Sequence, residues 1–198
     1  MLTGTDRKEE ILKVSERLFK EKGYASTSVR DIAKELSIEP ASLYSHITSK
    51  EDILEQICFN MAYKFQSAID EVNDIYFDAP QKLKLAVQAH VNLLTQNLDA
   101  ATVFIRDWRH LSEPKLSAFI ELRNKYEEGI REIIQTGIDE EKYNPIDKKF
   151  GALTILSAVN WIVEWYKPDG NLTPDQIAER LYQFILTGLR KDVAPGLN

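Results

Sequence analysis

Apolar residues recur at every third or fourth position along most of the chain, and no stretch alternates in the manner of a half-buried strand. This pattern predicts an all-α protein. Gly23, Pro80 and Pro145 interrupt the periodicity and separate helices. The expected helices cover residues 5–22, 28–36, 40–46, 49–77, 83–94, 101–111, 116–138, 147–166 and 173–189.

Several of these helices begin with residues that satisfy the free backbone N–H groups of a first turn. Ser28 with Asp31, and Thr173 with Gln176, have the spacing of a capping box. Pro40 suits the first position of the third helix, where a missing N–H costs nothing. These caps support the predicted starts of three helices.

The helix expected at residues 147–166 is apolar on more than one face. Both faces must be buried, and in a chain of this size one of them is more simply covered by a second copy than by a further internal layer. The pattern therefore predicts that one face meets a second copy of the chain, and our hypothesis is a homodimer joined through the last two helices.

The composition is that of a folded protein outside the membrane, with 198 residues, 43% hydrophobic and 28% charged. No apolar run approaches the length of about 18 residues that a membrane span needs. The first residues lack the apolar stretch of a secretory signal, and the single cysteine, Cys58, allows neither an intramolecular disulfide nor a thiolate metal cage. We therefore expect a cytoplasmic protein without a membrane partner.

The net charge of −6 argues at first against nucleic acid, since an acidic surface repels phosphate. The charge is unevenly distributed, however. Residues 1–50 carry a net charge of +1 and residues 51–198 a net charge of −7. This division predicts two parts with different partners.

Residues 28–46 have the pattern of a helix-turn-helix, with a capped helix, a break at residues 36–38 and a second helix from Pro40. The inner positions are apolar or small, as two crossing helices require. The outer positions of the second helix carry small or hydrogen-bonding side chains of the kind that enter a major groove. Pattern alone also allows an ordinary three-helix unit.

Three stretches of this region resemble the DNA-binding domain of TetR-family transcriptional repressors. They are residues 28–36 (SVRDIAKEL), 43–46 (LYSH) and 49–54 (SKEDIL), and with the first helix the resemblance covers residues 6–54. It implies about nine helices in two domains, a helix-turn-helix DNA-binding domain at 1–50 and an effector-binding and dimerisation domain at 51–198. It also implies a ligand-responsive repressor that binds a palindromic DNA operator as a homodimer.

The resemblance assigns DNA contacts by position. Phosphate contacts fall to Thr27, Ser28, Tyr44, His46 and Lys50. Base reading falls to Glu39, Ala41, Ser42 and Ser45 on the second helix of the motif, with Arg30 from the first. Two alternatives stay open: Ser28 acts only as a helix cap, and Lys50 is an ordinary solvated lysine.

Three positions depart from the family pattern. Ser37 stands where glycine is frequent, so it must adopt a left-handed conformation or a modified turn. Glu39 stands where Ser or Thr usually caps the helix and places a negative charge near phosphates. Ile47 replaces a common Phe. The fold is expected to tolerate all three changes.

The C-terminal part resembles the branch of the family that responds to acyl-CoA thioesters in fatty-acid, steroid and aromatic-acid breakdown. The resemblance rests on residues 106–111 (RDWRHL), 126–127 (YE), 160–170 (NWIVEWYKPDG) and 172–178 (LTPDQIA). An acyl-CoA has an apolar tail and several phosphates, so its site needs aromatic side chains beside cations. The expected effector-binding residues are Phe104, Arg106, Trp108, Arg109, Trp161 and Trp165. Trp161 and Trp165 can equally belong to the core or the dimer interface.

Catalytic motifs are missing from the sequence: there is no Gly-rich phosphate loop, no His-Glu-x-x-His and no Gly-x-Ser-x-Gly. Asp107 and His110 are three residues apart on one helix, whereas a helical metal site needs ligands from several helices. We therefore expect no enzyme, metal or cofactor. The alternatives are a TetR-type regulator of another hydrophobic ligand class, an acyl-thioester enzyme, and a helical interaction dimer that does not bind DNA.

Overall fold

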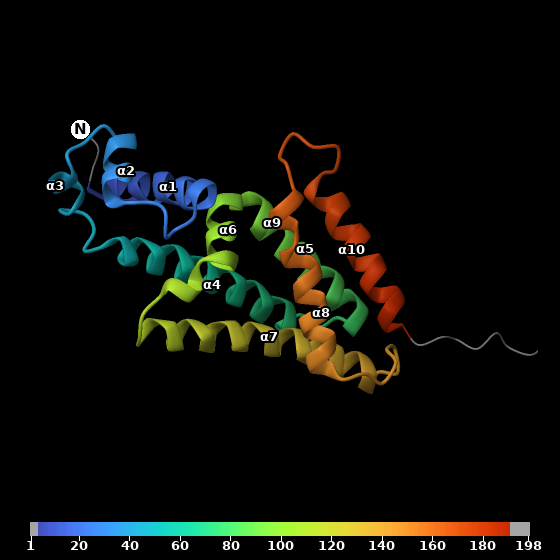
Figure 1. The fold of residues 1–198 in the computed structure, drawn as a ribbon. Coiled ribbons are helices and arrows are strands. Elements are labelled where there is room, and N and C mark those ends of the chain that lie inside the picture. The colour runs from blue at the N-terminus through green and yellow to red at the C-terminus, as the bar shows by residue number, and fades with distance from the viewer. Residues whose placement is uncertain (1–3, 191–198) are drawn as a thin grey trace, which may run out of the picture. The chain divides into compact units, whose positions relative to one another are not determined.

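The computed structural model describes residues 4–190, which are helical with short connections (Figure 1). The helices are α1 (Gly4–Lys22), α2 (Val29–Glu35), α3 (Pro40–Leu43), α4 (Lys50–Asp74), α5 (Ala79–Gln96), α6 (Leu98–Arg106), η1 (Trp108–His110, 3-10), α7 (Lys115–Asp139), α8 (Lys148–Asn160), α9 (Ile162–Trp165) and α10 (Pro174–Leu189). Over residues 4–190 the structure contains no β-strand, only an isolated bridge between Tyr143 and Arg190. The predicted all-α class is confirmed.

The chain forms two compact units. The first comprises the residues up to Tyr63 together with Asn97–Glu121, and the second comprises Lys64–Gln96 together with the residues from Leu122 onward. The first unit thus contains α6 and η1 as well as the three N-terminal helices, while α4 and α7 each contribute to both units. The boundary expected after residue 50 stays a prediction. No helix within residues 4–190 has the length and apolar character to cross a membrane.

In the first unit, α1 packs against α2 and α6. Its inner face buries Ile11, Leu18 and Phe19, and Ile32 of α2 is equally inaccessible to solvent. Lys20 of α1 forms an ion pair of 2.6 Å with Asp99 of α6. Burial of these apolar side chains supplies the main stabilising free energy of the unit, and the position of the ion pair shows that α6 belongs with the N-terminal helices.

The end of α1 is set by Gly23, whose φ of +85° lies in the left-handed region. Glycine adopts this conformation without a Cβ penalty and is therefore the usual residue just past a helix. The Gly23 N–H still donates to the Phe19 carbonyl at 2.8 Å, which closes the last turn. The chain then turns into the loop that precedes α2.

In the second unit, α5 lies alongside α10 and also contacts α8 and α9 (Figure 1). α10 begins at the predicted capping box, in which the Thr173 hydroxyl accepts from the Gln176 N–H and the Gln176 side chain accepts from the Thr173 N–H. Tyr143, in the loop after α7, is almost fully buried. Its ring lies so close to Gly137 that a Cβ there would be 2.1 Å from Cδ2.

Several predicted helices have different bounds in the structure; for example, the helix expected at residues 101–111 is divided into α6 and η1. The helix expected at residues 147–166 is divided into α8 and α9 at Trp161. The Glu164 N–H donates to the Trp161 carbonyl three residues back, and the four-residue spacing resumes from Tyr166 to Ile162. The helix expected at 40–46 is α-helical over Pro40–Leu43 and continues as turns through His46. α4 ends at Asp74, so residues 75–77 lie outside the helix.

Candidate DNA interface and effector cluster

The first helix of the predicted motif, α2, is held at its start by reciprocal bonds between Ser28 and Asp31. The Asp31 N–H donates to the Ser28 hydroxyl at 3.2 Å, and the Asp31 carboxylate accepts from the Ser28 N–H at 2.8 Å. The Ser28 hydroxyl also donates to that carboxylate, and these bonds lower the pKa of Asp31. The capping box is confirmed, and whether Ser28 also contacts a phosphate stays a prediction.

The turn between α2 and α3 contains Ser37 with a φ of +53°. Ser37 therefore adopts the left-handed conformation that was expected where the family frequently has glycine. This conformation is strained for serine because of its Cβ. The Ile38 N–H donates to the Ala33 carbonyl at 3.0 Å, which ties the turn back to α2. This turn sets the angle at which α3 leaves α2.

α3 presents one face to solvent and the other to the core. Leu43 and Ile47 are buried, so Ile47 fills the place of the usual Phe with another apolar side chain. Glu39 is the N-cap residue but makes no side-chain capping bond, and its carboxylate is exposed. The remaining predicted DNA contacts of this region are exposed or, for His46, half-buried: Arg30, Ala41, Ser42, Tyr44, Ser45 and His46. Their contacts with DNA stay predictions.

Thr27 lies on the inner side of the loop and is only 1% exposed. Its hydroxyl donates to the Gly23 carbonyl at 2.9 Å and to the Leu18 carbonyl at 3.3 Å. Its N–H donates to the Tyr24 carbonyl at 3.2 Å. The structure therefore does not bring Thr27 to the outer face with the other predicted phosphate contacts; its bonds tie the loop to α1.

Lys50, the first residue of α4, is fixed against the same loop. Its Nζ donates to the carbonyls of Tyr24 at 2.8 Å and Thr27 at 2.9 Å. The ammonium also lies 4.2 Å from the centre of the Tyr24 ring, within the range of a cation–π interaction. Lys50 is therefore not a freely solvated lysine in this structure, although its phosphate contact stays a prediction.

Four of the six predicted effector-binding residues lie in the first unit, in or beside an aromatic cluster around the buried Phe119. The rings of Phe104, Trp108 and Phe59 have their centres 5.5, 5.8 and 5.8 Å from that of Phe119. The Arg109 guanidinium lies 4.4 Å from the centre of the Trp108 ring, and Arg106 is exposed. The sequence pattern does not distinguish Phe119 and Phe59 from other aromatic residues on amphipathic helices, so neither was predicted as part of this cluster.

Trp161 and Trp165 lie in the second unit and are exposed, Trp161 by 63%. They share one helical row with Phe150 and Leu153 of α8, which are exposed as well. Phe184 of α10 is 79% exposed. These five exposed residues of α8, α9 and α10, which we call the α8–α10 apolar face, are large apolar side chains of the kind found at interaction sites.

The second unit also buries a polar trio that sequence analysis did not single out. His90 of α5 has its Nδ1 2.7 Å from the Tyr126 hydroxyl and its Nε2 3.0 Å from Oδ1 of Asn160. An amide oxygen only accepts, so Nε2 carries the hydrogen and Nδ1 accepts from the Tyr126 O–H. Burial lowers the pKa of His90 to about 4, so the ring is neutral at pH 7.

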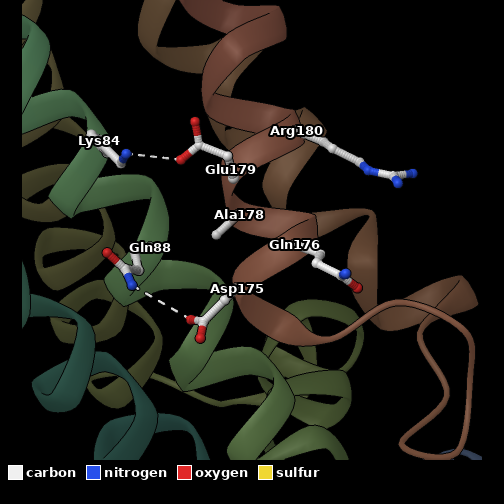
Figure 2. A pocket seen from close by; sticks show the side chains of 7 residues that line it. All are labelled: Lys84, Gln88, Asp175, Gln176, Ala178, Glu179 and Arg180. Atoms are coloured by element: carbon white, nitrogen blue, oxygen red, sulfur yellow. Dashed lines mark hydrogen bonds and ion pairs between the residues drawn. The ribbon is translucent and has the colours of Figure 1, made fainter.

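A surface hollow of about 610 Å³ lies between α5 and α10 (Figure 2). Charged side chains of both signs line it, and two contacts cross it: the Lys84–Glu179 ion pair at 2.9 Å and the hydrogen bond from Gln88 to Asp175 at 3.5 Å. The side chain of Arg180 points away from these contacts (Figure 2). This polar lining does not suit an apolar effector.

A capped helix, a left-handed turn and a second helix with an exposed polar face together define a helix-turn-helix DNA-binding protein. Comparison with known families agrees: residues 11–57 match the family described as bacterial regulatory proteins, tetR family, and residues 77–189 match the tetracyclin repressor-like C-terminal domain. The chain belongs to the TetR family of bacterial transcriptional regulators. The family predicted from the sequence is confirmed.

Three relatives span nearly the whole chain. The HTH-type transcriptional repressor KstR2 of Rhodococcus jostii is 26% identical over 186 residues, which is 92% of this chain and 91% of KstR2. The crystal structure of PfmR from Thermus thermophilus has 30% identity and a TM-score of 0.83, covering 91% of this chain and 99% of PfmR. AibR in complex with isovaleryl coenzyme A and operator DNA has 27% identity and a TM-score of 0.81, covering 90% of this chain and 97% of AibR.

Proposed function

We propose that this protein is a cytoplasmic repressor that binds a palindromic operator as a homodimer and is released by a hydrophobic effector of the acyl-CoA class. The observation that carries the proposal is the helix-turn-helix with its outer polar face and with Lys50 fixed beside it. KstR2 is a repressor, and the AibR structure holds both an acyl-CoA and operator DNA. Residues 1–50 make the DNA contacts in this proposal, and residues 51–198 serve the effector and the dimer.

On the DNA, Tyr44, His46, Lys50 and the start of α2 at Ser28 contact phosphates, while the outer face of α3 reads bases. The net charge of +1 in residues 1–50 is small for a DNA-binding domain. Affinity therefore depends on helix N-termini, hydroxyl groups and a few placed cations, and we expect a shallow dependence on salt. Thr27 supports the loop from inside.

The homodimer forms through the α8–α10 apolar face. Leaving five large apolar side chains in water is unfavourable, and a symmetric dimer buries the same surface of both copies at once. This proposal assigns Trp161 and Trp165 to the interface and not to the effector site. The two recognition helices then reach successive major grooves about one helical turn apart.

The effector binds at the aromatic cluster around Phe119. Phe104, Trp108 and Phe119 provide apolar surface for an acyl group, and Arg106 and Arg109 provide cations for the phosphates of coenzyme A. Effector binding changes the spacing of the two recognition helices. It can do so only to the extent that the effector binds the released and DNA-bound states unequally.

Selection of bound fragments from a genomic DNA library, with and without a panel of acyl-CoAs, tests the proposal. We expect one short palindrome to be enriched and its recovery to fall when the effective acyl-CoA is present. Enrichment that no acyl-CoA changes would favour a regulator of another hydrophobic ligand class. A lack of any enriched sequence would overturn the assignment of the outer face of α3 to base reading.

A further inference from the structure

The ring of Tyr24 lies between two charged or polar groups from distant parts of the first unit. The ammonium of Lys50 is 4.2 Å from the ring centre, and the imidazole of His110 is 5.2 Å away at an interplanar angle of 33°. Phe19 of α1 packs edge-on against the same ring at 5.2 Å. Tyr24 is only 9% exposed, so these contacts hold the ring in place.

The backbone of Tyr24 contacts Lys50 and lies near Asp107, which belongs to the same short turn as His110. Burial raises the pKa of the Asp107 carboxyl, and the nearby Tyr24 backbone partly offsets that rise. The Tyr24 carbonyl accepts from Nζ of Lys50 at 2.8 Å. Asp107 and His110 belong to one short turn, in which the His110 N–H donates to the Asp107 carbonyl at 2.9 Å. Tyr24 thus connects this turn to Lys50 through both its ring and its backbone.

The outer two residues of this turn and the inner two have different neighbours. Asp107 and His110 contact Tyr24, whereas Trp108 contacts Phe119 and Arg109 lies over Trp108. A ligand that binds at Trp108 or Arg109 would therefore contact the same short turn that carries Asp107 and His110. The segment has one side on the aromatic cluster and the other on the loop that fixes Lys50.

We propose that Tyr24 is a positioning residue for DNA binding, which holds the Lys50 ammonium for a phosphate and is itself set by the Asp107–His110 turn. The proposal rests on the proposed function, in which Lys50 contacts DNA. An ammonium group has three donors, and two are directed at the carbonyls of Tyr24 and Thr27. The third is the donor that a phosphate oxygen takes, and its direction depends on where Tyr24 lies.

A double-mutant cycle tests the first part, with fluorescence anisotropy of the full-length protein on labelled duplex DNA. Tyr24→Leu should weaken binding about fivefold for each subunit and lower the salt slope by about one phosphate contact per subunit. The same change should have no further effect when Lys50→Met is already present, because the group that Tyr24 positions is then missing. Tyr24→Phe, which keeps the ring, is the matched control and should bind like wild type.

An equal loss from Tyr24→Leu with and without Lys50 would overturn the positioning role. Because Tyr24 is buried, thermal unfolding must accompany each measurement, and the exposed His110→Ala variant gives a second approach that spares the core. NMR of lysine ε-methylene groups reports the Tyr24 ring current at Lys50. We expect His110→Ala to move that signal toward the random-coil position and to weaken binding; an unchanged signal and affinity would contradict the role of the turn.

The outcomes separate this proposal from the proposed function. Operator selectivity and acyl-CoA release in the wild type test the repressor. The cycle can be measured at low salt on a non-specific duplex, where phosphate contacts alone supply the affinity. Wild-type protein that binds DNA without sequence selectivity would therefore contradict the proposed repressor function. The double-mutant cycle would still test the coupling between Tyr24 and Lys50 independently.

Discussion

The hydroxyl of Tyr126 lies 2.7 Å from Nδ1 of the buried His90, and this contact ties α7 to α5 inside the second unit. Asn160, at the end of α8, accepts from the opposite ring nitrogen. Phe65 packs over the imidazole with ring centres 4.6 Å apart. Protonation would turn Nδ1 from an acceptor into a donor, so the Tyr126 oxygen would have to accept and the buried Tyr126 hydrogen would lose its partner.

This arrangement predicts that stability falls as the pH drops. The pKa of His90 is about 4 in the folded protein and 6.5 in an unfolded chain, so the unfolded state binds more protons between these values. The contribution of neutral His90 to the free energy of unfolding is therefore present above about pH 6.5 and is lost as the pH falls toward 4. We expect about 2 kcal/mol of the free energy of unfolding to be lost from pH 7 to pH 5, measured by urea titration.

The control for this prediction is His90→Gln, which cannot titrate. Its free energy of unfolding at pH 7 should be lower than that of wild type, because the trio is broken. Between pH 7 and pH 5, however, it should lose about 2 kcal/mol less than wild type, because no histidine at position 90 takes up a proton. Equal pH dependence in the two proteins would contradict the assignment of a neutral buried His90.

Ser37→Gly should stabilise the protein. The φ of +53° at Ser37 is strained for a residue with a Cβ and relaxed for glycine, so the free energy of unfolding should rise by about 1 kcal/mol. Ser42→Gly in α3 is the matched control and should have the opposite sign, because glycine destabilises a helix. Thermal unfolding of both variants checks the prediction; a loss of stability in Ser37→Gly would show that the serine side chain supports the turn.

Gly137→Ala should destabilise the second unit. An added Cβ would lie 2.1 Å from the ring of Tyr143, which is almost fully buried and cannot swing into solvent. Overpacking of this kind costs about 1–3 kcal/mol. Combining the change with Tyr143→Leu should recover part of the loss, since the smaller side chain leaves room, and denaturant titration of the single and double variants measures this. No recovery would mean that the clash is not with Tyr143.

Trp161→Glu and Phe184→Glu should convert the proposed dimer to a monomer. Each change places a charge on the α8–α10 apolar face, where a second copy would have to desolvate two such charges. Tyr76→Glu is the control, because Tyr76 is fully exposed at 102% but lies outside that face. Sedimentation velocity should show a dimer for wild type and for Tyr76→Glu, and a monomer for Trp161→Glu and for Phe184→Glu. A dimer that survives both Trp161→Glu and Phe184→Glu would place the interface elsewhere.

Local features of the fold could be predicted from the sequence because neighbouring residues determine them. The Ser28–Asp31 and Thr173–Gln176 boxes, Pro40 at a helix start and the left-handed Ser37 all depend on a few adjacent residues, and all are confirmed. The exposed outer face of α3 followed equally from helical periodicity.

Features that depend on distant contacts could not be predicted. Thr27 precedes a helix start and therefore resembled a phosphate contact, but its hydroxyl is taken by carbonyls of Leu18 and Gly23. Phe119 and His90 lie on ordinary apolar rows, and their clusters form only when several helices meet. Similarly, nothing in the apolar pattern of residues 147–166 marks Trp161 as the division between α8 and α9.

Anisotropy titration of the wild-type protein on the selected palindrome and on a scrambled duplex, at one fixed salt concentration, tests operator recognition and effector release together. We expect much tighter binding to the palindrome, a loss of affinity of about tenfold or more when an effective acyl-CoA is present, and little change on the scrambled duplex. Equal affinity for both duplexes, or operator binding that no member of an acyl-CoA panel alters, would contradict the proposed function.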